Sequence, residues 1–116
     1  MTKEEKELLI KDLCGRLSYG VMVRTSVSTK PLTCEILSHI INGTNNFTIL
    51  PYLRPMSSMT DEEKETYECF FNEDGLINCS VYVYVDWLLE HHLDYRGLIP
   101  RGLALEAPED MYIFKN

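Results

Sequence analysis

The chain has 116 residues and a formal net charge of −7, from 11 basic and 18 acidic side chains. This length suits one domain, and the hydrophobic share of 45% is ordinary for a globular protein, which excludes an intrinsically disordered class. Nucleic-acid binding is disfavoured, because it depends on lysine and arginine contacts to phosphates. The acidity either keeps a small domain soluble or forms a face that binds a basic partner or imitates nucleic acid.

Neither a membrane-spanning segment nor a signal peptide is predicted. No apolar run reaches the length of a spanning helix, and the first residues lack a basic start followed by an apolar run. We therefore expect a cytoplasmic protein without a membrane partner. The cysteines form no C-x-x-C pair, so we expect free thiols and neither metal nor cofactor. The alternative is a metal site built from Cys69, Cys79, His91 and His92.

The N-terminal segment has helical periodicity. Leucines recur every four residues between positions 9 and 17, which makes one apolar stripe with Leu9 and Leu13 facing the core. Thr2 and Glu5 have the spacing of a capping box, in which each side chain binds the other's backbone amide. The sequence predicts a helix from about Lys3 to Leu17.

A β-rich region should follow this helix. Alternating apolar residues predict strands over 21–27 and 32–38, and a third strand over 47–50. Turn residues separate the strands at 28–31 and 42–46. Because connections of this length are too short for parallel crossovers, we predict a three-stranded antiparallel meander.

The second half should be mainly helical. An irregular link over 51–56 leads to a helix that Thr60 and Glu63 cap and that runs to about Phe70, before a turn at 72–75. Residues 81–85 favour a strand by composition. We predict a helix over 80–92 instead, because Ser80 is a good N-cap and no breaker follows before His92.

The remaining residues complete the expected fold. Residues 103–107 are predicted as a last short strand, and the tail over 108–116 should lie along the surface and be loose at its end. The predicted fold is therefore a single α+β domain over 1–116, with a small antiparallel sheet packed by two or three helices.

Residues 91–106 concentrate the chemistry of the chain, with two imidazoles, two carboxylates and two guanidinium groups. His91 and His92 are adjacent on the predicted helix and point about 100° apart, so they cannot easily share a metal ion. One of them could be a general base oriented by Asp86 or Asp94. The simpler interpretation is that one histidine packs or caps the helix and the other is solvated.

Three further features suggest binding surfaces. Tyr95, Arg96 and Arg101 flank glycine turns, and arginine forks match phosphates or carboxylates. The competing interpretation is that the arginines neutralise nearby surface carboxylates, which are Asp94, Glu106 and Glu109. An exposed Trp87 would indicate a protein interface.

Three segments of the chain, over 12–21, 51–60 and 86–107, resemble a group of short proteins from gut Bacteroidales bacteria, their prophages and their phages. This resemblance covers about half of the chain and implies an accessory protein of a mobile element, made in a bacterial cytoplasm. The group has no assigned activity to transfer. We expect a non-enzymatic protein that binds a host or phage protein. The alternatives are a binder of a small anionic ligand such as a nucleotide, and a small hydrolase using His91 or His92.

Overall fold

The computed structural model describes residues 2–42 and 49–112, in which four α-helices accompany a four-stranded sheet. The predicted α+β class is confirmed. The elements in chain order are α1 (Lys3–Arg16), the 3-10 turn η1 (Leu17–Tyr19), β1 (Met22–Arg24), β2 (Thr29–Pro31), α2 (Cys34–Ile41), β3 (Leu50–Leu53), the 3-10 turn η2 (Met56–Ser58), α3 (Asp61–Cys69), α4 (Val81–Glu90) and β4 (Leu105–Glu106).

The sheet is mixed, so the prediction of a purely antiparallel meander was wrong. Its strand order is β2-β1-β3-β4, in which β1 pairs antiparallel with both β2 and β3. β4 pairs parallel with β3, through Tyr52 with Leu105 and Leu53 with Glu106. A parallel pair needs a long crossover, and the connection from β3 to β4 provides one because it contains α3 and α4.

The region between β1 and β3 also differs from its prediction. The predicted turn over 28–31 contains β2, and the predicted strand over 32–38 is replaced by α2. The Thr33 hydroxyl accepts a hydrogen bond from the Ile36 amide at 3.2 Å and so caps α2. Ile36, Leu37 and Ile40 are buried at helical spacing, which explains why this segment is a helix. Most of the predicted turn over 42–46 and the start of the strand over 47–50 lie outside the described residues.

Local caps set the starts of the helices that were predicted. The Glu5 amide donates to Thr2 Oγ1 at 3.1 Å and the Thr2 amide donates to Glu5 Oε1 at 2.9 Å, which is the predicted capping box of α1. The Ser80 hydroxyl accepts from the Tyr82 amide at 3.3 Å and caps α4, so the helix predicted over 80–92 is confirmed. The predicted last strand is confirmed as β4.

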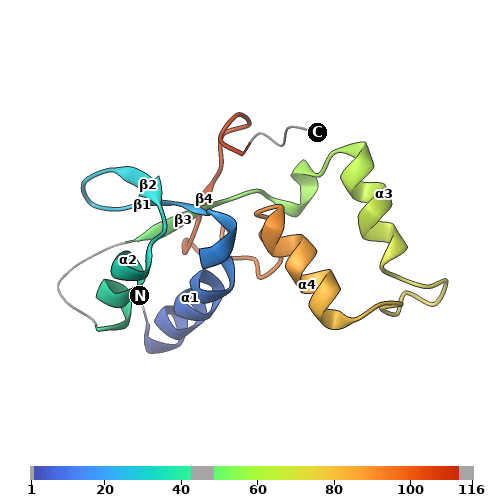
Figure 1. Cartoon of the computed structure of the whole chain (residues 1–116), viewed down its shortest axis with the longest axis horizontal. Coiled ribbons are helices and arrows are strands. Elements are labelled where there is room, and N and C mark those ends of the chain that lie inside the picture. The colour runs from blue at the N-terminus through green and yellow to red at the C-terminus, as the bar shows by residue number, and fades with distance from the viewer. Residues whose placement is uncertain (1, 43–48, 113–116) are drawn as a thin grey trace.

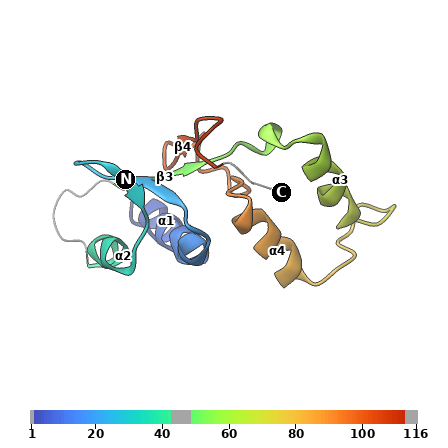
Figure 2. The ribbon, with the colours of Figure 1, turned by 45° about the horizontal axis from the view of Figure 1, so that its top comes forward.

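The helices lie in two groups around the sheet. In Figures 1 and 2, α1, α2 and the sheet form one end of the molecule, and α3 lies at the other end beyond α4. The main core joins α1, α2 and the sheet, and Leu13, Val21, Val23 and Leu53 are fully buried in it. No described residue of α3 is buried, so α3 depends on its contacts with α4 and on the ion pair of its Glu63 with Arg54.

Aromatic rings join α3 to α4. The ring of Phe70 meets that of Trp87 edge-on at 5.5 Å between centroids, and the ring of Phe71 meets that of Tyr84 in the same way at 5.6 Å. Tyr67 contacts Phe71, Tyr84 and Trp87 as well. Such pairs add about 0.5–1.5 kcal/mol each beyond the burial of their area, so they hold the C-terminal end of α3 and the two residues after it against α4.

Leu13→Ala is expected to lower the free energy of unfolding by about 2–5 kcal/mol, because a buried leucine is replaced by a cavity. Urea denaturation followed by circular dichroism measures this loss. Leu76→Ala is the matched control, since Leu76 is 65% exposed and its replacement should cost less than about 0.5 kcal/mol. Equal losses in the two variants would mean that the stripe of α1 does not carry the core.

Candidate functional site

A cleft with a volume of about 990 Å³ lies between the α3–α4 pair and the chain that follows β4. Its lining residues come from the segment just after β3, from η2, from the N-cap and first half of α3, from Trp87 of α4 and His91 just after that helix, and from residues 106–112. Ligand sites commonly have volumes of roughly 300–1,000 Å³, so the cleft is large enough to take a small molecule or a few side chains of a bound peptide.

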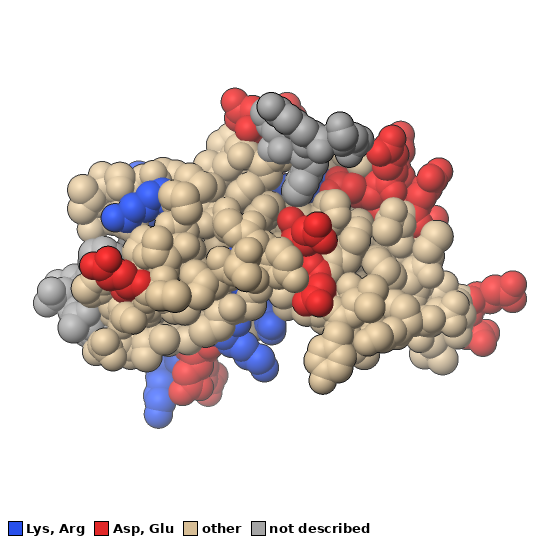
Figure 3. Space-filling model, in the orientation of Figure 1, with Lys and Arg blue, Asp and Glu red and all other residues tan. Residues whose placement is uncertain are grey.

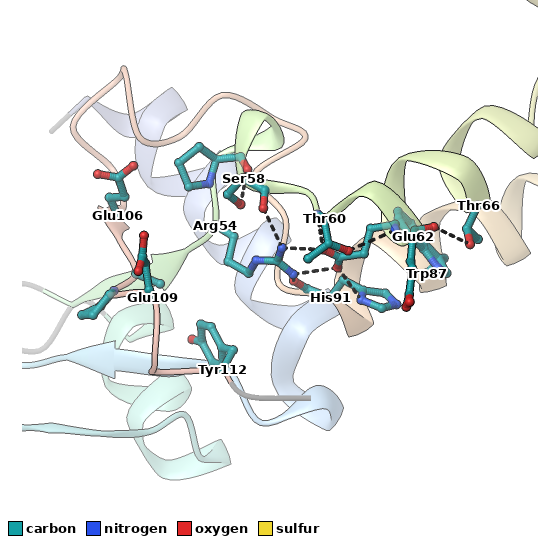
Figure 4. A pocket seen from close by; sticks show the side chains of 14 residues that line it. Arg54, Ser58, Thr60, Glu62, Thr66, Trp87, His91, Glu106, Glu109 and Tyr112 are labelled. Carbon is teal, nitrogen blue, oxygen red and sulfur yellow. Dashed lines mark hydrogen bonds and ion pairs between the residues drawn. The ribbon is translucent and has the colours of Figure 1, made fainter. Parts of the chain in front are cut away.

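An ion-paired centre occupies the wall of the cleft, as Figure 4 shows. Arg54 Nη1 donates to Glu63 Oε2 at 2.8 Å and Arg54 Nη2 donates to Glu63 Oε1 at 2.7 Å, which is a bidentate pair. Glu63 Oε1 also accepts from the Thr60 amide at 2.9 Å and completes the capping box of α3. His91 Nδ1 lies 2.9 Å from Glu63 Oε2. One carboxylate of α3 therefore connects the residue after β3 with the residue after α4.

The backbone around Arg54 fixes this centre in place. The Arg54 amide donates to the His92 carbonyl and the Arg54 carbonyl accepts from the Asp94 amide, each at 2.8 Å. The guanidinium also donates to the Ser58 carbonyl at 3.2 Å and to the His91 carbonyl at 3.3 Å. The segment after β3 is thereby held against the segment after α4, and the Arg54 side chain has little freedom to turn toward a ligand.

The charge of the cleft is mainly negative. The hydrogen bonds from Arg54 lower the pKa of Glu63 to about 2, so Glu63 is ionised at neutral pH. Three more carboxylates line the cleft, those of Glu62, Glu106 and Glu109, and all three residues are exposed. Within residues 2–42 and 49–112, none of these three makes an ion pair. The single guanidinium of the lining is already paired with Glu63.

His92 does not line the cleft, although the adjacent residue His91 does. The chain turns at His92 with a φ of 57°, and the imidazole stacks on the Tyr112 ring at 3.8 Å between centroids. Burial lowers the pKa of His92 to about 4, and the positive charges of Arg16 and Arg54 act in the same direction. His92 is therefore neutral at pH 7 and is a packed core residue.

Tyr95 and Arg96 belong to a second polar network on the other side of His92. Arg96 Nε lies 3.2 Å from Asp12 Oδ1, and its guanidinium lies 4.9 Å from the centre of the Tyr95 ring. The fully buried Arg16 donates through Nε to Asp12 Oδ2 and through Nη2 to the Leu93 carbonyl, each at 2.7 Å. This network joins α1 to the chain after α4 and is structural in character.

The position of Arg101 does not support the predicted anion site. The contacts of Asp94 do not support the competing interpretation, in which the arginines neutralise surface carboxylates. Arg101 is exposed and lies outside the cleft, so it does not converge with Arg96 on one pocket. The Asp94 carboxylate accepts the amides of Leu98 and Ile99 at 2.8 and 2.9 Å and shapes their turn. Among the described residues, the carboxylate that pairs with Arg96 is that of the buried Asp12, and not one of the surface carboxylates named in the competing interpretation.

The structure thus places two of the six predicted site residues, Trp87 and His91, in the cleft. Sequence reasoning missed Arg54, Glu63 and Tyr112 as site residues. Glu63 was recognised only as a capping residue, and nothing local marks its pairing with Arg54. The Tyr112 hydroxyl donates to the Tyr52 carbonyl at 2.8 Å and accepts from the Met22 amide at 2.7 Å, so the described part of the tail is docked on the sheet.

The cysteines lie apart from the cleft lining. All four are free thiols, of which Cys79 is partly exposed and the others are exposed. Within the described ranges, no group of three or more histidine, cysteine, aspartate or glutamate side chains is placed to hold a metal ion. Trp87 is half-buried, and the exposed apolar residues of this region lie instead around the start of α4, where they are Leu76, Ile77, Val81, Tyr82 and Val83.

Comparison with known proteins gives no assignment. No protein-family model, curated protein or solved structure matches the chain. Among the described residues, no helix is both long enough and apolar enough to cross a membrane. Any functional conclusion therefore depends on the cleft and on the residues that line it.

Proposed function

We propose that this chain is a non-enzymatic interaction protein that binds another protein through the cleft between the α3–α4 pair and the chain after β4. The observation that carries the proposal is the cleft itself, which combines aromatic walls with exposed carboxylates on a preformed frame. The resemblance of three segments to proteins of Bacteroidales bacteria and their phages supports a role as an accessory protein of a mobile element, acting in a bacterial cytoplasm on a host or phage protein.

The ion-paired centre favours a binding role over catalysis. A general base must accept a proton near neutral pH, and a carboxylate held at a pKa of about 2 by Arg54 is a poor one. Both oxygens of Glu63 are occupied by the guanidinium, and one also accepts the Thr60 amide. The centre therefore acts as a clamp that fixes the walls of the cleft.

A hydrolase using His91 is the second candidate, because one observation favours it. His91 Nδ1 lies 2.9 Å from a carboxylate oxygen inside a cleft, which is how a general base is often oriented. A hydrolase of this kind should turn over simple ester or phosphate-ester substrates and lose that turnover in His91→Gln. We expect no turnover by the unaltered protein. The anion-binding alternative has less support, since Arg96 and Arg101 do not line the cleft.

Site-specific photocrosslinking tests the binding role. A photoreactive phenylalanine at Thr66, an exposed residue of the cleft lining, should form a crosslink to one protein from the source cells. The same group at Val27, which is 85% exposed in the β1–β2 hairpin, is the matched control and should not crosslink to that protein. Crosslinks from Val27 but not from Thr66 would place the binding surface outside the cleft.

A further inference from the structure

We infer that the cleft recognises a cationic segment of the partner, one that carries at least two lysine or arginine side chains. This inference rests on the proposed function and names the chemistry of the ligand. The cavity provides the space, and its unbalanced carboxylates provide the preference for positive charge. Peptide binding and the Thr66 crosslink together distinguish a cleft that binds a partner without positive charge from a cleft that binds no partner.

The imbalance of charge inside the cavity is the first step. Four carboxylates line it, against one guanidinium that already makes a bidentate pair with Glu63. The three remaining carboxylates belong to Glu62, Glu106 and Glu109, which have no ion-pair partner in the described part of the chain. Carboxylates of one sign that line a hollow focus the electric field there, which concentrates cations at the site.

The placement of these carboxylates suggests two contact points. Figure 4 shows Glu106 and Glu109 on one side of Arg54, and Glu62 with Trp87 on the other side. They come from different elements, since Glu62 is on α3 and Glu106 ends β4. A segment lying across the cleft can therefore place one cationic side chain at each group of carboxylates.

Aromatic residues add a second mode of cation recognition. Trp87 and Tyr112 both line the cleft and both are partly exposed. Guanidinium and ammonium groups are attracted to the faces of such rings, most strongly to tryptophan. Arginine fits both kinds of group, because its planar head pairs with a carboxylate and stacks on an aromatic ring. An arginine-rich segment should bind more tightly than a lysine-rich one.

The charge distribution of the whole chain also favours the approach of a cationic partner to the cleft. Residues 61–116 carry 13 acidic and four basic side chains, whereas residues 1–60 carry five acidic and seven basic ones. Figure 3 shows acidic atoms over the part of the molecule that contains α3, and basic atoms mainly near α1 and the β1–β2 hairpin. A positively charged partner is therefore steered toward the half that contains the cleft.

Fluorescence of Trp87 measures binding directly, because it is the only tryptophan of the chain and lines the cleft. The probe is an acetylated octapeptide of alternating arginine and glycine. At low ionic strength it should change the Trp87 emission with a saturable dependence on concentration. Replacing each arginine of the peptide by glutamine should abolish the change, and about 0.5 M salt should weaken it strongly.

Two triple variants with the same change in net charge give the decisive comparison. The first, E62Q/E106Q/E109Q, removes the unpaired carboxylates of the cleft and should weaken binding about tenfold or more. The second, E7Q/E68Q/E73Q, removes three exposed carboxylates outside the cleft and should weaken it less than about threefold. Circular dichroism of both variants checks that they fold.

The outcomes distinguish the two proposals. Equal weakening in both triple variants, or no binding of the arginine peptide to the unaltered protein, would overturn the cationic ligand class. If the Thr66 crosslink to a partner still forms in that case, the binding role stands and the partner is recognised by other chemistry. If the crosslink is also missing, both proposals fail.

Discussion

Replacement of Arg16 by methionine is expected to destabilise the protein by about 3–5 kcal/mol, more than any surface substitution. Arg16 and Asp12 are both completely buried and paired at 2.7 Å, so the change leaves a buried carboxylate for which the described residues supply only Arg96 as a counter-charge. It also removes the hydrogen bond to the Leu93 carbonyl, which joins α1 to the chain after α4. Urea denaturation followed by circular dichroism measures the loss.

Two controls show whether the loss of stability comes from the buried Asp12 carboxylate that R16M leaves without its Arg16 partner. Arg24→Met removes an exposed arginine of β1 and should cost less than about 0.5 kcal/mol. The double variant D12N/R16M removes both buried charges of the pair and should be more stable than R16M alone, because the carboxylate is no longer charged. A double variant that is less stable than R16M would show that shape, and not charge, dominates this site.

The elements that were predicted correctly are those set by contacts a few residues apart. The capping boxes at Thr2 and Thr60 and the cap at Ser80 each involve a side chain and an amide two or three residues away. Such signals are complete in the sequence, so the starts of α1, α3 and α4 could be predicted. For α4 the cap and the absence of a breaker outweighed the β propensity of residues 81–85, whose first three side chains remain exposed.

The errors arose where distant packing decides the structure. The alternation of Cys34 and Ile36 fits a strand as well as a helix, and the burial of Ile36, Leu37 and Ile40 against the rest of the core favours the helix. The parallel pairing of β4 with β3 depends on the path of the connection through α3 and α4, and no local sequence pattern encodes that path. Short apolar runs therefore could not give the order or direction of the strands.

The same distinction applies to the candidate site. The concentration of polar residues over 91–106 predicted a functional surface, and in the structure Asp94 and Arg96 of this segment belong to polar networks. Their partners, however, come from far away in the sequence. The bond from Arg16 to Leu93 spans 77 residues, and that from Arg54 to His91 spans 37. No spacing rule could place Arg54 and Glu63 beside His91.

Acidification is expected to destabilise the protein in two successive pH ranges. The pKa of His92 is lowered by burial from its ordinary 6.5 to about 4, so the unfolded chain gains a proton first as the pH falls. The free energy of unfolding is therefore unaffected by protonation of His92 above pH 6.5, and it decreases as the pH falls from 6.5 to about 4. Since one pKa unit corresponds to about 1.4 kcal/mol, the loss from His92 amounts to roughly 3 kcal/mol.

Glu63 produces the second range. Its pKa is lowered from 4.5 to about 2 by the hydrogen bonds from Arg54, so its contribution is present above pH 4.5 and is lost as the pH falls toward 2. The carboxylate lies in the wall of an open cleft, and solvent and salt screen its interaction with Arg54. The total loss of stability from Glu63 should therefore be smaller than the loss from His92.

The variants His92→Asn and Glu63→Gln assign each range to its residue. Asparagine tolerates the φ of 57° at position 92 and has no proton to gain, so His92→Asn should flatten the melting temperature between pH 6.5 and 4 only. Glu63→Gln should lower stability at pH 7, because it removes the charged partner of Arg54, and should flatten the curve below pH 4.5 only. Each variant is the control for the other. If His92→Asn keeps the slope of the unaltered protein above pH 4, burial of a neutral His92 against Tyr112 is not what limits stability in acid.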